Sequence, residues 1–329
     1  MMVNMKKISI IGAGSWGTTL AVIAAENGYE VTLWAREKET IQSVNEKREN
    51  KNYLPGIKIP DNVYAESSIE KVASNADLLI NAIPAQFTRE VAKQYSKYVN
   101  CNTVVNVAKG IEAGTYKRMS EILKEELGNV SIVSLSGPNH SEEVSRKMPT
   151  ATVIASEDVN CLKDIKQIFH TNYFRVFTHD DIIGVEVCGA LKNIAAIATG
   201  VCDGLGYGDN AKASIITIGL MEMSTYGKFL GAKRATFYGL AGVGDLVATC
   251  TSKHSRNRLV GERVAKGKKI ENIKKEMKGM IAEGIQTTKA VYEFSEKNKL
   301  YMPLTKQAYD VLYKNKDLKE AISDLLKIE

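Results

Sequence analysis

Residues 7–21, KISIIGAGSWGTTLA, place a glycine-rich turn between a short apolar run and a segment of helical composition. Gly12, Gly14 and Gly17 complete the spacing G-x-G-x-x-G. Between a strand and a helix, the first glycine permits the tight turn and the second lets a pyrophosphate approach the backbone. The third allows close packing of helix on strand. The stretch therefore predicts a strand, a turn and a helix that together bind a dinucleotide.

The backbone that follows Gly14 supplies the anion-binding groups of such a turn. The amides of Ser15 and Trp16 are expected at the positive end of the helix dipole, where phosphates bind. The alternative is a glycine-rich turn without a ligand. The position of the motif in the first strand–helix unit favours dinucleotide binding.

The end of the second expected strand, VTLWARE (31–37), indicates which coenzyme the turn takes. A site specific for NADH carries Asp or Glu there to hold the ribose hydroxyls, whereas this chain has Arg36. A guanidinium offers a planar fork of donors that suits a 2′-phosphate. We therefore expect NADPH to be preferred. NADH remains an alternative, because Arg36 could be a solvent-exposed residue and the adjacent Glu37 could reach the ribose.

The composition of the chain is that of a globular protein long enough for two domains. It has 329 residues, 44% apolar and 25% charged, and 44 basic against 38 acidic side chains give a net charge of +6. No uninterrupted apolar stretch approaches the roughly 18 residues that span a bilayer, and the start lacks a signal-peptide cleavage region. We expect a cytoplasmic protein with no membrane span. Widely spaced cysteines and scattered histidines predict reduced thiols and no metal site.

Apolar runs of strand length alternate with helical segments up to residue 180, and this pattern stops afterwards. Such alternation predicts right-handed crossovers and a largely parallel sheet. The later segments have the composition of helices. We predict an α/β protein with a doubly wound sheet domain at 1–180 and an all-α domain at 181–329. The expected strands are 8–11, 31–34, 78–83, 104–107, 132–135, 152–155 and 175–177.

Two loops that follow expected strands, NAIPAQ (81–86) and NVAKGIE (106–112), lie where open parallel sheets bind ligands. Pro84 would stiffen the first loop, and Lys109 would bring a cation to an anionic ligand in the second. We expect both to border the nicotinamide. A plain strand-to-helix turn is the alternative for each.

The segment VCGALKNIAAIATGVC (187–202) carries one charged side chain, Lys192, in an otherwise apolar helical pattern. A desolvated lysine has a depressed pKa and can exchange a proton near neutral pH, as an acid/base catalyst must. The alternative is a lysine that reaches the surface on its aliphatic stem.

A second glycine-rich stretch, GLAGVGDL (239–246), ends near Asp245 and predicts a backbone that meets a ligand closely. Ser255, Arg256 and Asn257 follow and offer a hydroxyl, a guanidinium and an amide, which suit a phosphate monoester. A solvated polar turn is the alternative. The basic residues after Arg256 are interleaved with glutamates and lack an aromatic platform, so we expect no nucleic-acid binding. Glu283 could face either the cofactor or solvent.

Eight motifs occur in the order seen in the bacterial-type NAD(P)-dependent glycerol-3-phosphate dehydrogenases, which the chain resembles over about residues 6–325. They are GAGSWG, AIPAQ, VAKGIE, SGPNHSEEV, ALKNIAAIATG, GLAGVGDL, TSKHSRNR and AEGIQTTKA. The resemblance implies a Rossmann domain followed by a helical domain of the 6-phosphogluconate dehydrogenase C-terminal type. It also implies a homodimer that reversibly reduces dihydroxyacetone phosphate, a phosphorylated triose, to sn-glycerol 3-phosphate for phospholipid synthesis.

The resemblance carries roles onto individual residues. Lys192 matches the proposed proton acceptor for the alcohol, and Lys109 and Asp245 complete the implied catalytic set. The substrate-binding positions are Lys109, Gly137, Asn139, Lys192, Asp245, Ser255, Arg256 and Asn257. The cofactor-binding positions are Gly12, Gly14, Ser15, Trp16, Gly17, Arg36, Pro84, Lys109, Ser141, Arg256, Ile281 and Glu283.

Two residues depart from the family pattern. Members commonly have Ser or Thr at the position of Asn139, and Ala at that of Ser141. Asn139 can still donate a hydrogen bond, and Ser141 adds a hydroxyl where a backbone contact to the cofactor is expected.

Two other functions compete with this interpretation. One is a β-hydroxyacid or 6-phosphogluconate-type dehydrogenase, which also joins a Rossmann domain to a helical one. The other is a non-catalytic NADP(H) sensor. Lys192 and Asp245 count against the sensor, because sensing needs no proton-transfer lysine within an apolar helix.

Overall fold

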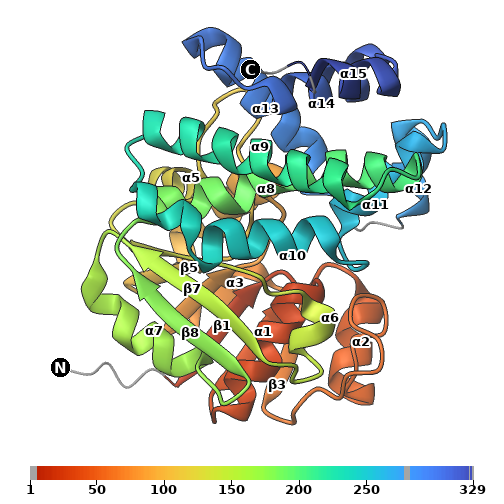
Figure 1. The fold of residues 1–329 in the computed structure, drawn as a ribbon. Coiled ribbons are helices and arrows are strands. Elements are labelled where there is room, and N and C mark those ends of the chain that lie inside the picture. The colour runs from red at the N-terminus through yellow and green to blue at the C-terminus, as the bar shows by residue number, and fades with distance from the viewer. Residues whose placement is uncertain (1–5, 278–281, 326, 328–329) are drawn as a thin grey trace. The chain divides into compact units, whose positions relative to one another are not determined.

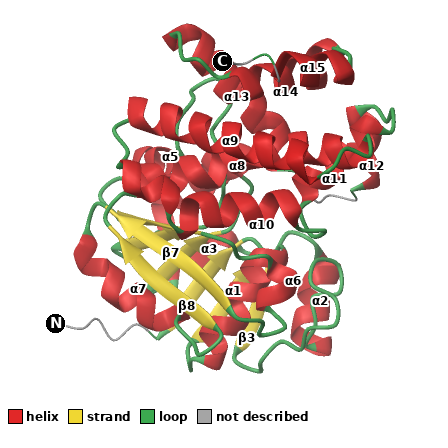
Figure 2. Ribbon diagram, in the orientation of Figure 1, coloured by secondary structure: helices red, strands yellow, loops and turns green. Residues whose placement is uncertain are grey.

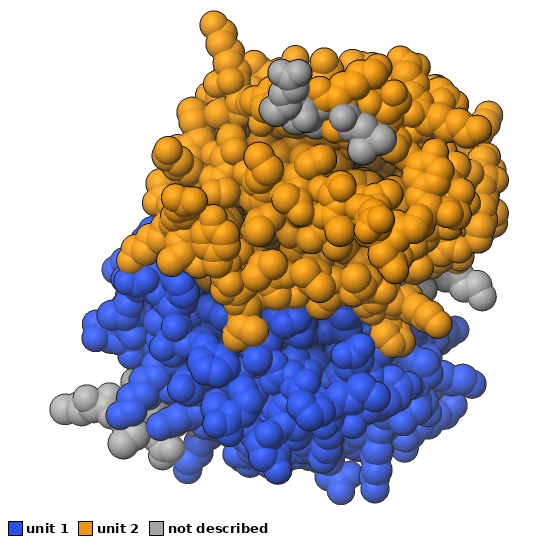
Figure 3. Space-filling model, viewed as in Figure 1, with its two compact units in different colours: residues 1–108, 119–182 blue, residues 109–118, 183–329 orange. Residues whose placement is uncertain are grey.

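The computed structural model describes residues 6–277, 282–325 and 327. They form two compact units, shown in different colours in Figure 3: residues 1–108 with 119–182, and residues 109–118 with 183–329. The division expected from the sequence is contiguous, whereas here the short segment 109–118 belongs to the second unit. Lys109 is therefore held by the helical unit.

The first unit is built on one sheet, drawn in yellow in Figure 2. The sheet has eight strands in the order β3-β2-β1-β4-β5-β6-β7-β8. The pair β6·β7 is antiparallel, and the other neighbours in the described sheet are parallel. The first six strands in this order have the doubly wound arrangement that the sequence predicts. The strands are β1 (Lys7–Ile11), β2 (Glu30–Trp34), β3 (Val63–Glu66), β4 (Leu78–Asn81), β5 (Thr103–Asn106), β6 (Ser131–Ser136), β7 (Thr150–Ser156) and β8 (Phe174–His179).

The edge strand β3 is the one strand that the sequence analysis missed. It pairs only with β2 among the described strands, and Tyr64 on it is 57% exposed. Its short alternation of buried and exposed residues differs from the unbroken apolar runs of β4 and β5, which are buried throughout. Strands covered on both faces produce the stronger sequence signal.

Helices cover the sheet in two groups. One group contains α1, which packs against α6 and α7, and the other contains α3, α4 and α5, which pack in succession. The helices of the unit are α1 (Ser15–Glu26), α2 (Lys38–Lys47), α3 (Ile69–Ser74), α4 (Thr88–Tyr95), α5 (Met119–Leu127), α6 (Ser141–Val144) and α7 (Leu162–Phe169), with 3₁₀ turns η1 (Ala85–Phe87), η2 (Ser96–Tyr98) and η3 (Val159–Cys161).

The second unit is helical, as predicted (Figure 1). Its helices are α8 (Ile182–Gly204), α9 (Asp209–Phe229), α10 (Asp245–Thr251), α11 (Arg256–Ala265), α12 (Ile270–Glu276), α13 (Glu283–Asn298), α14 (Pro303–Lys314) and α15 (Leu318–Leu325), with the turns η4 (Arg234–Tyr238) and η5 (Leu240–Gly244).

The central helix α8 is mostly apolar. By length and composition it could cross a membrane, but 89% of its most apolar window is buried inside the protein. A helix with apolar residues all round becomes a core helix when its neighbours cover it. Lys192 and Asn193 on α8 are 5% and 4% exposed, so Lys192 does not reach the surface on its stem.

Glycines bring α8 and α11 into backbone contact. A Cβ added at Gly200 would lie 1.9 Å from the carbonyl oxygen of Arg258, and one at Gly261 would lie 1.9 Å from that of Ile197. Even a methyl group is excluded at both places. The two helices can therefore approach this closely only because these positions are glycine.

We expect Gly261→Ala to lower the free energy of unfolding by about 1–3 kcal/mol, since the added methyl forces α8 and α11 apart. Urea denaturation measures the change. Gly208→Ser is the matched control, because Gly208 is the N-cap of α9 with open space around its Cα, where serine is favoured. Equal stability of Gly261→Ala and the parent protein would contradict the close crossing.

A buried carboxylate on α9 caps the start of α14. Glu222 is 4% exposed and accepts hydrogen bonds from the backbone N–H of Leu304 at 2.5 Å and of Thr305 at 3.1 Å. Its Oε2 also accepts from the Thr305 hydroxyl at 2.6 Å. Burial raises the pKa of Glu222 to about 7, although these hydrogen bonds lower it.

Because folded Glu222 binds its proton more tightly than the unfolded chain does, its contribution to stability is present below pH 4.5 and is lost as the pH rises to about 7. Glu222→Gln stays neutral and keeps an acceptor oxygen. We expect its free energy of unfolding, relative to the parent protein, to rise by on the order of 3 kcal/mol across this window. Denaturation at several pH values measures this, and parallel stability curves would refute it.

Candidate active site

The glycine-rich turn of the first unit fits a dinucleotide. Gly12 has φ +119°, and a Cβ there would lie 2.7 Å from the carbonyl oxygen of Ala82. A Cβ at Gly17 would lie 2.0 Å from the carbonyl oxygen of Gly12. Gly14 has open space around it. Packing therefore requires Gly12 and Gly17, and the space at Gly14 leaves room for a ligand to approach the backbone.

The start of α1 lies directly after this space. Gly14 is its N-cap and has no side chain to cap the first turn, which begins with Ser15 and Trp16. The indole Nε1 of Trp16 is buried without a hydrogen-bond partner in the described chain, and its ring packs edge-on against Phe174 at 6.1 Å. Backbone N–H groups at the positive end of a helix dipole suit a pyrophosphate.

Arg36 lies on the surface after β2. Its side chain is 77% exposed, and its Nη2 lies 3.6 Å from Oε1 of Glu37. Exposed ion pairs contribute about 0–1 kcal/mol, so the contact with Glu37 does not prevent the guanidinium from binding another anion. A 2′-phosphate would displace Glu37 from Arg36, because it accepts bidentate, charge-assisted hydrogen bonds from the guanidinium.

The other expected residues of the first unit follow strands. Pro84 is the N-cap of η1 after β4. Gly137 follows β6 with φ +148°, and Asn139 donates to the hydroxyl of Thr152 at 3.0 Å. Ser141 begins α6 and is buried. All these residues lie in the part of the sheet domain where ligands bind, at the carboxyl ends of the parallel strands.

The centre of the site in the second unit is a buried carboxylate. Asp245 begins α10 and is 1% exposed. Its Oδ1 accepts a hydrogen bond from Lys192 Nζ at 2.5 Å, and its Oδ2 accepts one from Lys109 Nζ at 2.9 Å. Three segments distant in sequence therefore meet at one carboxylate, each of whose oxygens holds an ammonium group.

Burial and charge set the protonation of this cluster. Burial lowers the pKa of Lys192 to about 7, Asp245 opposes the change, and Lys109 adds to it as a like charge. Burial alone would raise the pKa of Asp245, but the two ammonium groups hold it below its usual range. Asp245 is therefore ionised at neutral pH, whereas Lys192 is present in both forms and can exchange a proton.

The sequence analysis missed Thr249, which completes the cluster. Its hydroxyl oxygen lies 2.8 Å from Lys192 Nζ and 3.2 Å from Oδ1 of Asp245. Thr249 stands four residues after Asp245 on α10, so the helical period could have identified it. Within the described chain, Asp245 and Thr249 take two of the three N–H groups of Lys192, which leaves one to donate to a substrate oxygen.

The polar residues at the start of α11 have structural partners as well. Ser255 is the N-cap, and its Oγ accepts from the N–H of Arg258 at 3.2 Å. Asn257 donates to the Oδ1 of Asn193 on α8 at 2.9 Å and accepts from the N–H of Gly284 at 2.9 Å. The hydrogen bond from Gly284 to Asn257 places the start of α13 beside α11, and α13 begins with Glu283.

These contacts leave the start of α11 able to bind an anion. Among the contacts of the described residues, the Ser255 hydroxyl only accepts, so its proton stays available for donation, and Asn257 uses one of its two N–H groups. Arg256 follows the cap at the positive end of a ten-residue helix. Asn193, which fixes Asn257, is a second residue that the sequence analysis did not assign to the site. Ile281, expected at the cofactor, lies outside the described residues.

One of the glycines before Asp245, Gly242, is required by the packing of the protein itself, whereas the sequence analysis expected a ligand at this backbone. A Cβ at Gly242 would lie 2.1 Å from the carbonyl oxygen of Phe237, so this backbone packs against the protein itself. The turn η5 that results directs the chain into α10. The close approach that the sequence predicted at Gly242 is therefore made by Phe237.

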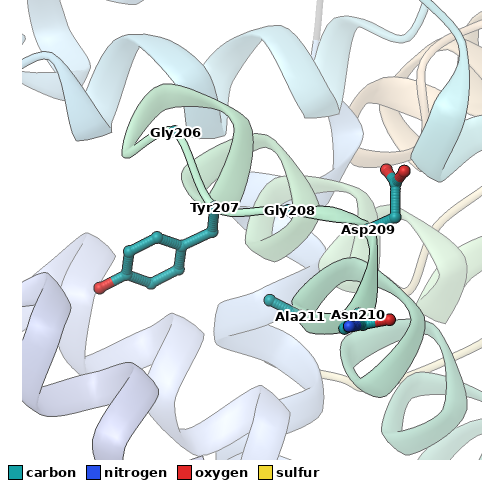
Figure 4. A pocket seen from close by; sticks show the side chains of 6 residues that line it. All are labelled: Gly206, Tyr207, Gly208, Asp209, Asn210 and Ala211. Carbon is teal, nitrogen blue, oxygen red and sulfur yellow. The ribbon is translucent and has the colours of Figure 1, made fainter.

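The second unit also has a surface pocket, which is lined by other residues than those expected at the site. Residues 206–211, at the α8–α9 turn, line it (Figure 4). The side chains of Tyr207 and Asp209 point in different directions, and Asp209 pairs with Lys212 at 2.9 Å. None of the expected site residues lines this pocket.

Both units match models of one protein family. Residues 7–162 match the model described as the N-terminus of NAD-dependent glycerol-3-phosphate dehydrogenase, and residues 181–323 match the model of its C-terminus. The glycerol-3-phosphate dehydrogenase [NAD(P)+] of Chlorobium limicola is 47% identical over 326 residues, which cover 98% of each chain. That of Geobacillus kaustophilus is 46% identical and covers 98% of this chain and 94% of its own.

A solved structure shares the fold over the same length. The crystal structure of glycerol-3-phosphate dehydrogenase from Coxiella burnetii is 35% identical, covers 98% of this chain and 99% of its own, and has a TM-score of 0.94. The two family models together include the glycine-rich turn, Lys192, Asp245 and the start of α11. The chain therefore belongs to the NAD-dependent glycerol-3-phosphate dehydrogenase family.

Proposed function

We propose that this protein catalyses the reversible, NAD(P)H-dependent reduction of dihydroxyacetone phosphate to sn-glycerol 3-phosphate. The product is the backbone on which glycerophospholipids are built. The observation that carries the proposal is the buried ammonium of Lys192 on Asp245, at 2.5 Å, in a chain of this family. Reduction of a ketone needs both a hydride and a proton, and Lys192 is placed to give the proton.

NAD(P)H supplies the hydride to C2 of the substrate when it is bound. Lys192 donates a proton from Nζ to the developing alkoxide, and in the reverse direction it accepts the proton of the alcohol. Asp245 holds this ammonium in place. Lys109 stabilises the oxyanion, since its positive charge lies on the other oxygen of the same carboxylate.

The phosphate of the substrate is assigned to the start of α11. Arg256, the Ser255 hydroxyl and the remaining N–H of Asn257 donate to it. Gly137 and Asn139 of the first unit are assigned to the substrate as well. Because the phosphate does not react, its binding energy serves to position the carbonyl.

In the first unit, the turn Gly12–Gly17 and the residues Pro84 and Ser141 are assigned to the coenzyme, with Lys109, Arg256 and Glu283 from the second unit. Arg36 is assigned to a 2′-phosphate, which makes NADPH the favoured coenzyme.

We expect Lys192→Met to lower kcat for ketone reduction by about 10²–10⁴-fold, because the proton donor is lost. Lys109 still neutralises Asp245 in this variant, so the fold is kept. In the parent protein, reduction should decline as the pH rises through the pKa of Lys192, about 7, while oxidation of glycerol 3-phosphate should increase. Absorbance at 340 nm follows both directions.

Three controls accompany this assay. Lys306→Met removes an exposed lysine of α14 and should leave kcat unchanged. Unphosphorylated dihydroxyacetone should be a poor substrate, and β-hydroxyacids or 6-phosphogluconate should give no reduction of NADP⁺. Near-normal turnover by Lys192→Met would refute its role as the acid. Tight NADPH binding without turnover of any phosphorylated ketone would instead indicate a sensor.

We expect Arg36→Ser to raise KM for NADPH by roughly 10-fold or more and to leave KM for NADH unchanged, because charge-assisted hydrogen bonds contribute about 1.5–3 kcal/mol. Initial rates with each coenzyme measure this. Glu37→Gln is the matched comparison and should lower KM for NADPH slightly, since it releases the neighbouring guanidinium. Equal effects of Arg36→Ser on both coenzymes would contradict the assignment.

We also propose that the enzyme acts in the cytoplasm as a homodimer. The five cysteines are free thiols, which suits a reducing compartment. On α9, Met221 and Phe229 are 63% and 50% exposed, and large exposed apolar side chains are common at protein interfaces. Sedimentation in the presence of a reductant measures the oligomeric state.

A further inference from the structure

Residues 109–118 form a small hairpin that begins with Lys109 and ends with Arg118. Ile111 and Arg118 face each other in an antiparallel bridge, and the N–H of Glu112 donates to the carbonyl of Lys117 at 3.0 Å. Gly114, with φ +85°, lies in the turn. The two ends of the hairpin are therefore held side by side, so a contact made at Arg118 restrains Lys109 as well.

Beyond the contact of Lys109 with Asp245, an apolar residue, an aromatic ring and an ion pair hold this hairpin on the helices of the second unit. Ile111 is fully buried in the helical core, and the ring of Tyr116 packs edge-on against Phe294 of α13 at 5.9 Å. At the far end, Nη1 of Arg118 donates to Oε2 of Glu186 on α8 at 2.8 Å.

The Arg118–Glu186 pair is unusually buried for a salt bridge. The side chains are 10% and 3% exposed, whereas most ion pairs among the described residues have at least one well-exposed partner. A buried ion pair often gives no more stability than apolar residues of the same size, because both charges lose their hydration. Stability alone therefore does not account for this pair, and its fixed geometry suggests a positioning role.

The place of Glu186 on α8 links this pair to the active site. Glu186 precedes Lys192 by six residues, which is about 9 Å along a helix. The same helix thus holds Arg118 at one point and presents Lys192 at another. The contacts form a closed ring that runs from Lys109 through the hairpin to Arg118, across to α8, and back through Lys192 and Asp245 to Lys109.

We infer that the buried Arg118–Glu186 ion pair positions Lys109, so that the ammonium groups of Lys109 and Lys192 are held on opposite oxygens of Asp245. This inference rests on the proposed function. Arg118 and Glu186 are positioning residues, since they act on the reaction through Lys109.

The charge of Lys109 gives this role a measurable consequence. The groups that face Lys192 are Asp245, Thr249 and Cys250 from α10 and Lys109 from the hairpin. Lys109 is the like charge among them and lowers the pKa of Lys192. If Lys109 leaves its place, the pKa of Lys192 rises. The decline of ketone reduction with increasing pH should then occur at a higher pH.

The test compares four variants by thermal denaturation and by the pH profile of kcat. Arg118→Met removes the cationic partner of the buried Glu186 carboxylate, so this variant can fail to fold. The double variant Arg118→Met/Glu186→Met replaces the pair by apolar side chains and should fold. Arg118→Lys keeps the charge. Arg89→Met is the matched control, because it breaks an ion pair with Glu125 and Glu126 in the first unit.

We expect the double variant to keep a melting temperature close to that of the parent protein, with kcat for ketone reduction lowered about 10-fold. The alkaline limb of its profile should move up by roughly one pH unit. Arg118→Lys should restore most of the parent profile, and Arg89→Met should leave the profile unchanged whatever its effect on stability.

An active, folded double variant with the parent pH profile would overturn the positioning role and leave a purely structural pair. The outcome for the proposed function is separate, because the parent protein alone decides it. If the parent protein does not reduce dihydroxyacetone phosphate, the proposed function fails before any variant is compared.

Discussion

Two ammonium groups buried on a single carboxylate are the interaction on which the rest of this structure depends. Lys109 and Lys192 each hold one oxygen of Asp245, and all three groups are largely removed from water. Removing one partner from a buried charge pair typically costs about 3–5 kcal/mol, so the surrounding protein must keep the three together. When both lysines are protonated, the cluster carries one positive charge more than negative, and the like charge of Lys109 favours release of the Lys192 proton.

Close packing within the second unit keeps Lys109, Lys192 and Asp245 together. Gly200 and Gly261 let α8 and α11 cross at backbone distance, which brings Asn193 and Asn257 together and fixes the start of α11 relative to Lys192. Gly242 packs on Phe237 and so directs the chain into α10, which starts at Asp245. The functional side chains thus owe their positions to residues that do not touch a ligand.

Local patterns in the sequence predicted the doubly wound sheet, the helical second unit and the strand–turn–helix geometry of the glycine-rich turn, because each depends on neighbouring residues. The apolar segment around Lys192 left both a buried lysine and a surface-reaching one open, and the structure shows that Lys192 is buried. Thr249 could have been predicted as well, because it stands four residues, about one helical turn, after Asp245. The place of the hairpin 109–118 in the helical unit and the Arg118–Glu186 pair were not predictable, since they join residues far apart in the chain. The edge strand β3 lacks the unbroken apolar run that marks the central strands β4 and β5.

The most direct test of this account is the titration of Lys192 itself. Heteronuclear NMR of protein with isotopically labelled lysine side chains, with the Lys192 signal assigned from its absence in Lys192→Arg, reports the protonation of Nζ without turnover. The account predicts a midpoint at about pH 7. A midpoint near 10.5, the ordinary value for lysine, would show that the buried cluster does not tune this group and would contradict its role as the acid.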